Sequence, residues 1–226
     1  MGSVYSHTLK ERQTLLVSVC LFSMLTFSHG FDIIFSPKNG VCEDRALKRK
    51  MILTTVFLLI GFAIFLPISI ATANAVIEAV TITIGVTLYH FAMRLAVGTV
   101  VNLMMKNEAD HKNAWFREKR FEKRLYQLLC VRKWKKYIPT YDPDTFDTSK
   151  KTVKELVGAT CQAETVHEVI MVLSLLPIAA IPWLGGAGAL ITTSVLSMLI
   201  DSSFVILQRY NRPKLVRVME RFGRLK

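Results

Sequence analysis

The chain has 226 residues, of which 51% are hydrophobic and 20% charged, and its formal net charge is +12 at pH 7. A soluble domain interleaves polar and apolar residues at helical or strand period, but here residues 51–73 and 169–200 carry no charge while 106–136 are crowded with Lys and Arg. Because a charge in the bilayer centre costs several kcal/mol, the segregation predicts an all-α, polytopic membrane protein and excludes a soluble domain. Nucleic acid is excluded as a partner because no nucleic-acid motif is present and the basic residues flank apolar runs.

The first apolar run covers residues 15–35 and is interrupted by His29, Gly30 and Asp32. It fits a fifth membrane span, an interfacial helix or an uncleaved signal-like segment. Cleavage is not expected, because no small-x-small site follows the run. We favour a membrane helix.

The next two apolar runs predict a helical hairpin. Residues 51–73 are long enough to cross a bilayer as one helix, and Pro67 inside them is tolerated where neighbouring helices satisfy the freed backbone groups. Residues 76–105 form the second span. The link near Asn74 is so short that the two spans must lie side by side.

The second of these spans contains His90 and Arg94, which share one helix face because they are four residues apart. Arg94 lies about 16 Å along the axis from the basic loop, which is deep for a side chain that reaches the interface. We therefore expect both side chains to face the bundle interior, where they would bind an anionic headgroup or stabilise an oxyanion. The alternative is that Arg94 snorkels to the interface and His90 bonds a neighbouring helix.

Residues 106–165 are predicted to be a cytoplasmic segment with an amphipathic part at 113–138. There, apolar and aromatic residues recur every three to four positions between cations, as in helices that lie at a bilayer interface. The basic side chains Lys133, Lys135 and Lys136 are also candidates for holding the phosphates of a substrate.

No metal or cofactor is expected. Asp142 and Asp144 flank Pro143, and we favour a capped loop leading into a helix at 150–166 over metal binding by these carboxylates. Nucleotide-binding and hydrolase motifs are absent from the sequence. No cysteine belongs to a CxxC pair, so we expect reduced thiols at Cys20, Cys42, Cys130 and Cys161.

A second hairpin is predicted from the long uncharged run. Residues 169–200 are too long for one span, and the Gly-Gly-Ala-Gly sequence at 185–188 reads as a tight turn. This division gives spans at 166–184 and 187–207, followed by a basic tail at 208–226.

Orientation follows from the short basic segments. If both hairpins start and end on the same side, the Lys and Arg residues of 45–50, 106–136 and 208–226 lie together. Cytoplasmic loops carry an excess of such residues, so the basic loop and the C-terminus are predicted to be cytoplasmic in a multi-pass protein of the cell membrane. If residues 15–35 also span, the N-terminus lies outside.

Acidic residues surround a histidine where the second hairpin begins. Glu164, His167 and Glu168 lie on adjoining positions of one helix. A carboxylate beside a histidine fixes its tautomer and raises its basicity, as a general base requires. The helix N-terminus alone also favours acidic residues, which explains the glutamates but leaves the histidine unexplained.

The second half of the chain resembles the glycosyl-4,4'-diaponeurosporenoate acyltransferases, membrane enzymes of staphyloxanthin-type carotenoid biosynthesis. The resemblance runs from about residue 115 to the end. The matching pieces are FEK at 121–123, VRKWK at 131–135, the Glu155, Thr160, Ala163, Glu164 and His167 spacing, Leu176-Pro177, and QRYNRPKL at 208–215.

This resemblance implies transfer of a fatty acyl group to a hydroxyl of a lipid-linked or glycolipid acceptor. His167 would then be the general base, oriented by Glu164, and Asn211 would donate to the acyl carbonyl. The acyl donor would be acyl-CoA or acyl carrier protein. The substrate-binding residues on this reading are Lys133, Trp134, Lys135, Asn211 and Arg212. For Asn211, Arg212 and Pro213 the alternative is a helix stop with a basic residue beyond the span.

Two other function classes stay open. A non-enzymatic membrane protein, either a small transporter or an accessory subunit, could use His90 and Arg94 as a substrate pathway. An interfacial methyltransferase or reductase would need a cofactor, for which no motif is present.

Overall fold

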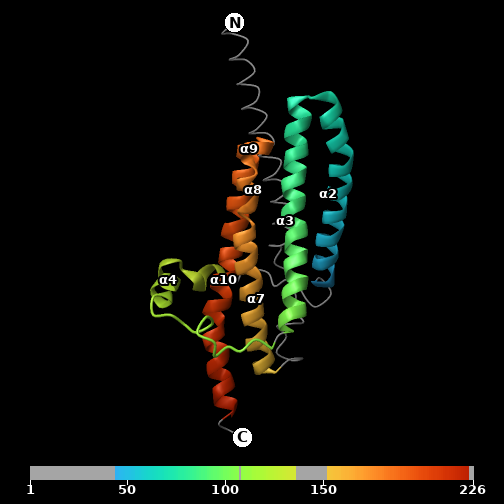
Figure 1. The fold of residues 1–226 in the computed structure, drawn as a ribbon. Coiled ribbons are helices and arrows are strands. Elements are labelled where there is room, and N and C mark those ends of the chain that lie inside the picture. The colour runs from blue at the N-terminus through green and yellow to red at the C-terminus, as the bar shows by residue number, and fades with distance from the viewer. Residues whose placement is uncertain (1–43, 107, 136–151, 224–226) are drawn as a thin grey trace.

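The computed structural model describes residues 44–106, 108–135 and 152–223, which form helices and turns without a strand (Figure 1). Within this part of the chain, four helical segments are long and apolar enough to cross a membrane. They are Arg49–Thr72, Ala75–Met105, Val153–Leu184 and Ala187–Arg221. The prediction of an all-α, polytopic membrane protein is confirmed. The membrane helix predicted at 15–35 lies outside the described residues, as do Asp142 and Asp144.

The first hairpin consists of helix α2 (Asp44–Thr72) and helix α3 (Ala75–Met105). The Asn74 side chain accepts a hydrogen bond of 2.8 Å from the Val76 amide, which caps α3 and lets the chain reverse in two residues. α2 packs on α3, and its remaining surface exposes large apolar side chains. Such a surface suits contact with lipid tails.

The second hairpin begins earlier than predicted. Helix α7 (Val153–Leu173) starts with a capping box in which Thr152 and Glu155 satisfy each other's amides. The helix predicted at 150–166 and the span predicted from 166 are therefore one continuous helix. Two short helices, α8 (Leu176–Ala179) and α9 (Ile181–Leu184), continue it, and each has a proline in its first turn.

The turn of this hairpin lies at Gly185 and Gly186, whose φ angles are +66° and +60°. A β-carbon on Gly186 would lie 2.9 Å from the Ile82 side chain of α3, so glycine is needed there for both conformation and space. Helix α10 (Ala187–Gly223) then runs through Pro213 without stopping. The helix-stop alternative at Asn211–Pro213 is thus wrong, and the predicted tail is largely the end of α10.

Helices α3, α7 and α10 lie side by side, and α2 lies beyond α3 (Figure 1). α7 and α10 pack along much of their length, and α3 contacts both. The apolar core between α3 and α7 contains Met93, Val97, Val101 and Ile170. This packing fixes the register of α3 against the second hairpin.

The predicted amphipathic segment forms two short helices. They are α4 (Glu122–Leu128) and α5 (Val131–Trp134), separated by Cys130 at a φ of +49°. Both lie beside the lower part of α10 (Figure 1). Tyr126 and Val131 are buried, whereas the apolar side chains of Phe121 and Leu128 are exposed, which fits contact with a bilayer surface.

Candidate functional site

A histidine–aspartate pair joins α7 to α10. His167 Nδ1 lies 2.9 Å from Asp201 Oδ1, and the imidazole stacks on Phe204 with ring centroids 4.5 Å apart. The Asp201 side chain is 1% exposed, but the His167 side chain is 21% exposed. Nδ1 is thus held by a buried carboxylate, while Nε2 has no bonded partner among the described residues. Such an imidazole is oriented to exchange a proton through Nε2.

Arg94 approaches the same carboxylate from α3. Its guanidinium forms an ion pair with Asp201 Oδ2 and donates a 2.9 Å hydrogen bond to Ser197 Oγ. Ser197 Oγ lies 2.7 Å from Ser174 Oγ of the second hairpin. Arg94 therefore faces the bundle interior and does not snorkel. Arg94 is predicted to bind a headgroup or stabilise an oxyanion. In the structure its guanidinium is instead paired with Asp201.

We call His167, Asp201, Arg94 and Ser197 the His167 cluster. Sequence reasoning missed Asp201, although a signal was present. It is the one acidic residue between 169 and 219, and an ionisable residue within a membrane span is costly enough to suggest a function.

His90 lies one turn before Arg94 on α3 and is 2% exposed. Neither of its ring nitrogens has a hydrogen-bond partner within the described part of the chain, and the same is true of Ser194 Oγ on α10. The edge of the Tyr89 ring contacts the imidazole, with centroids 5.4 Å apart. His90 is thus brought near the His167 cluster by its helix but is not bonded into it.

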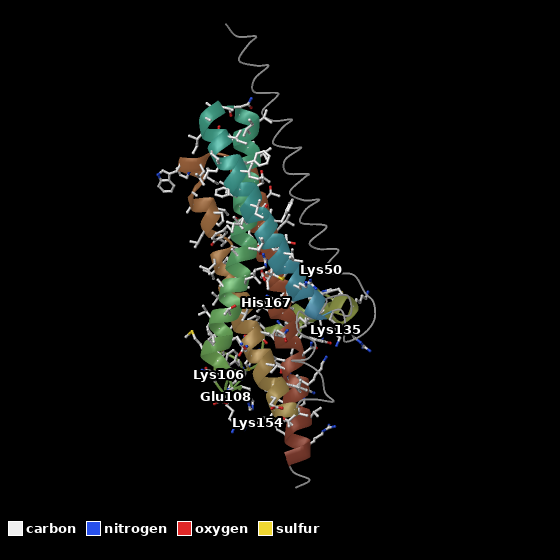
Figure 2. All side chains as sticks on the ribbon, turned by 90° about the vertical axis from the view of Figure 1, so that its right-hand side faces the viewer. Lys50, Lys106, Glu108, Lys135, Lys154 and His167 are labelled. Carbon is white, nitrogen blue, oxygen red and sulfur yellow. The ribbon has the colours of Figure 1, made fainter. Side chains whose placement is uncertain are left out.

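The His167 cluster lies toward the basic end of the bundle. His167 appears at the level of Lys50 and Lys135, above Lys106, Glu108 and Lys154 (Figure 2). Asp201 is fourteen residues into α10, or about 21 Å from the Gly185–Gly186 turn. The same residue lies twenty-two residues before the end of α10 at Gly223.

Glu164 belongs to a separate cluster. Its side chain is fully buried and forms ion pairs with Arg209 and Arg212 of α10. Arg209 also pairs with Glu122 of α4 at 2.6 Å. We call these four residues the Glu164 cluster. The prediction that Glu164 orients His167 is wrong, because Asp201 holds that position. The predicted use of Arg212 for donor phosphates also fails, since Arg212 is 3% exposed and paired with Glu164.

The same two arginines hold the turn that precedes α4. Arg209 donates to the carbonyl oxygens of Trp115 at 3.1 Å and Arg117 at 3.3 Å, and Arg212 donates to that of Phe116 at 2.9 Å. Carbonyl groups that lack a helical partner are thereby satisfied. The Glu164 cluster thus fastens the basic loop onto α7 and α10.

Two further contacts complete this fastening. Trp115 Nε1 donates to Glu168 Oε2 at 2.8 Å, and the Tyr126 hydroxyl donates to Glu122 Oε2 at 2.8 Å. Burial, together with this bond to Glu122, raises the pKa of the Tyr126 hydroxyl above its ordinary value. Tyr126 therefore acts as a neutral donor to a carboxylate.

The remaining predicted substrate residues are distributed over the loop and α10. Lys133 is exposed, and the Trp134 indole donates to the Leu129 carbonyl at 2.8 Å. Lys135 Nζ lies 5.2 Å from the Tyr210 ring centroid of α10. Asn211 is half-buried beside Arg212. No hydrogen bond or ion pair among the described residues connects this group to His167, so their roles stay predictions.

Fold and site together define a multi-pass helical membrane protein in which a histidine–carboxylate pair joins α7 to α10. Residues 112–221 match the family model described as glycosyl-4,4'-diaponeurosporenoate acyltransferase. The resemblance found in the sequence is thereby confirmed over that segment, which contains His167, Asp201 and the whole Glu164 cluster but excludes Arg94. No curated protein and no solved structure matches the chain.

Proposed function

We propose that this protein is a membrane acyltransferase that moves a fatty acyl group to a hydroxyl of a lipid-linked or glycolipid acceptor. The observation that carries the proposal is the His167–Asp201 pair within the segment that matches an acyltransferase family. The family description names a glycosyl carotenoid acid. From this description we carry over only the type of acceptor, a sugar hydroxyl on a membrane lipid.

In this reaction His167 is the general base. Nε2 removes the proton of the acceptor hydroxyl while that oxygen attacks the acyl carbonyl carbon of a thioester. The C–O bond forms, the C–S bond breaks, and the departing thiolate takes the proton back from His167. The net products are an ester and a thiol, so no further co-reactant is needed. The Asp201 carboxylate accepts from Nδ1–H throughout and stabilises the transient imidazolium.

We further propose that the donor, acyl-CoA or acyl carrier protein, arrives from the cytoplasm. The basic residues of the loop and of the end of α10 lie at one end of the bundle, which the positive-inside rule assigns to the cytoplasmic side. Lys133 and Lys135 are placed there to attract phosphates, with Trp134 beside them, and Asn211 can donate to the acyl carbonyl. The nearby His167 is 21% exposed, so reactants can reach it.

The second candidate is a small transporter or accessory subunit. It is favoured by one observation: His90, whose ring nitrogens have no partner among the described residues, lies one turn from Arg94 of the Arg94–Asp201 pair. A transporter would move a solute across sealed proteoliposomes without changing it chemically.

The test is mass spectrometry of lipids from cells that express the protein, compared with cells that lack it. We expect an acylated lipid that appears only with the wild-type chain and disappears with His167→Ala. His111→Ala is the matched control, because the His111 side chain is also 21% exposed and lies in the loop. An acylated product that persists in His167→Ala would refute the assignment of the base. A lipid profile that the wild-type chain leaves unchanged would favour the second candidate.

A further inference from the structure

We propose that the first hairpin completes the site of the second: Arg94 keeps Asp201 ionised and thereby determines which nitrogen of His167 carries the proton. Arg94 is a positioning residue in this account, since it acts on His167 through Asp201. Its importance for turnover rests on the proposed acyltransferase function, but its effect on the His167 tautomer does not.

The two carboxylate oxygens of Asp201 contact different residues. Asp201 Oδ1 lies 2.9 Å from His167 Nδ1, and Oδ2 is paired with the Arg94 guanidinium. Each oxygen therefore has a different partner, one from α7 and one from α3. The carboxylate is 1% exposed, so water is largely excluded as a substitute for either partner.

The buried charge of Asp201 needs a cation beside it. An ionised carboxylate removed from water without a cation is so costly that such a group normally takes up a proton. The Arg94 guanidinium offsets this cost, because it stays protonated and lies in direct contact with Oδ2. An ionised Asp201 can only accept, so His167 Nδ1 must donate, and Nε2 is left with its lone pair.

Without the Arg94 cation, the Asp201–His167 pair is expected to take up a proton. A proton taken up by the pair then lies either on Asp201, which donates it to His167 Nδ1, or on the imidazole itself. In both cases Nε2 carries a proton and could not accept one from a hydroxyl. One residue on α3 thus controls whether the base on α7 is usable.

The register of α3 is fixed independently of this ion pair. The Tyr89 hydroxyl donates to the Leu173 carbonyl of α7 at 2.9 Å, and Gln162 of α7 donates to Asn102 at 3.0 Å. The apolar core around Met93 and Ile170 adds to these contacts. A variant at position 94 should therefore change the electrostatics of the site without displacing the hairpin. The match to the acyltransferase family begins at residue 112, so Arg94 is supplied from outside the matching segment.

The experiment measures imidazole ¹⁵N chemical shifts in full-length protein reconstituted in lipid bilayers. The chain has five histidines, and the His167 signal is identified by its absence in His167→Ala. We expect Nδ1 protonated and Nε2 unprotonated in the wild type and in Arg94→Lys. We expect a protonated Nε2 in Arg94→Met and in Arg94→Gln, which can still bond Ser197. The control is Arg217→Met, because the only hydrogen bond of the Arg217 guanidinium among the described residues goes to the Pro213 carbonyl of its own helix.

Folding is checked in each variant by its melting temperature. Two neutral variants, Arg94→Met and Arg94→Gln, are used so that the test can still be made if one of them does not fold. A wild-type tautomer in a folded Arg94→Met or Arg94→Gln protein would overturn the inference. Loss of the wild-type tautomer in a folded Arg94→Lys protein would also overturn it, because a cation in that place should suffice.

Turnover separates this inference from the proposed function. In Arg94→Met we expect kcat to fall roughly 10²–10⁴-fold, as expected for a base in the wrong tautomer, with KM nearly unchanged. Arg94→Lys should regain most of this loss. If Nε2 becomes protonated in Arg94→Met but the wild-type chain transfers no acyl group, the inference stands and the proposed function fails. If the wild-type chain is active and Arg94→Met retains both its tautomer and its kcat, the inference fails alone.

Discussion

Two buried charge clusters connect the helices, and they differ in whether their polar atoms are all in use. In the Glu164 cluster, both carboxylates are paired with arginines, and the same two guanidinium groups also donate to loop carbonyls. In the His167 cluster, Asp201 has a partner on each oxygen, but Nε2 of the partly exposed His167 has no partner in the part of the chain that the structure describes.

The difference separates structural from chemical roles. A buried ionic network is stable only when its groups are satisfied, and the Glu164 cluster uses this completeness to fasten the loop to α7 and α10. A site that performs proton transfer must instead leave one atom available. The histidine is the member of the His167 cluster that does so.

The largest expected effect comes from opening the Glu164 cluster. Glu164→Ala leaves Arg209 with one carboxylate and Arg212 with none, and removing one partner of a buried pair costs about 3–5 kcal/mol. We expect a large loss of folded protein, measured by thermal unfolding in detergent. Glu220→Ala, at an exposed position of α10, should leave the melting temperature unchanged. Equal melting of both variants would show that the cluster does not hold the fold.

Removing the carboxylate of the His167 cluster should affect turnover as well as stability. Asp201→Asn is expected to lower kcat roughly 10²–10⁴-fold, because the amide no longer fixes the His167 tautomer, and to destabilise the bundle by leaving Arg94 unpaired. The double variant Arg94→Met, Asp201→Asn should regain stability but not turnover. Recovery of turnover in the double variant would mean that His167 needs no carboxylate.

A smaller effect is expected at His90. Since its buried nitrogens have no partner in the described part of the chain, His90→Leu should raise the free energy of unfolding by about 1–3 kcal/mol. Chemical denaturation of the reconstituted protein measures this change. A decrease in stability would show that the imidazole has a bonded partner, such as a water or a substrate group.

The smallest effect is expected at the edge of the His167 cluster. Ser174→Ala removes the 2.7 Å contact with Ser197 but leaves Ser197 bonded to Arg94. The expected loss is about 1 kcal/mol, with kcat within roughly twofold of wild type. A loss of turnover comparable with that of Asp201→Asn would extend the catalytic group to Ser174.

The hairpins could be predicted from the sequence because the bilayer sorts charges into blocks, and this sorting is visible without any tertiary contact. The partners of Glu164 could not be predicted from the sequence in this way. His167 follows it by three residues on the same helix, yet the cations that bind Glu164 lie 45 and 48 residues further along the chain. Which side chains meet is decided by the crossing of α7 and α10.

Pro213 illustrates the same limit. A proline inside a helix removes one backbone hydrogen bond and usually kinks or ends it, so a stop was a reasonable alternative. Here the residues just before it, Arg209 and Arg212, are anchored to Glu164 on α7. Tertiary contacts thus keep α10 helical where local preference opposes it.

The most direct test of the central claim is the initial rate of acyl transfer by purified protein in proteoliposomes, with a labelled acyl thioester and a glycolipid acceptor. The account predicts that His167→Ala loses activity by at least about 10³-fold while it stays folded and unfolds cooperatively, as the wild type and His111→Ala do. A folded His167→Ala protein with the wild-type rate would contradict it.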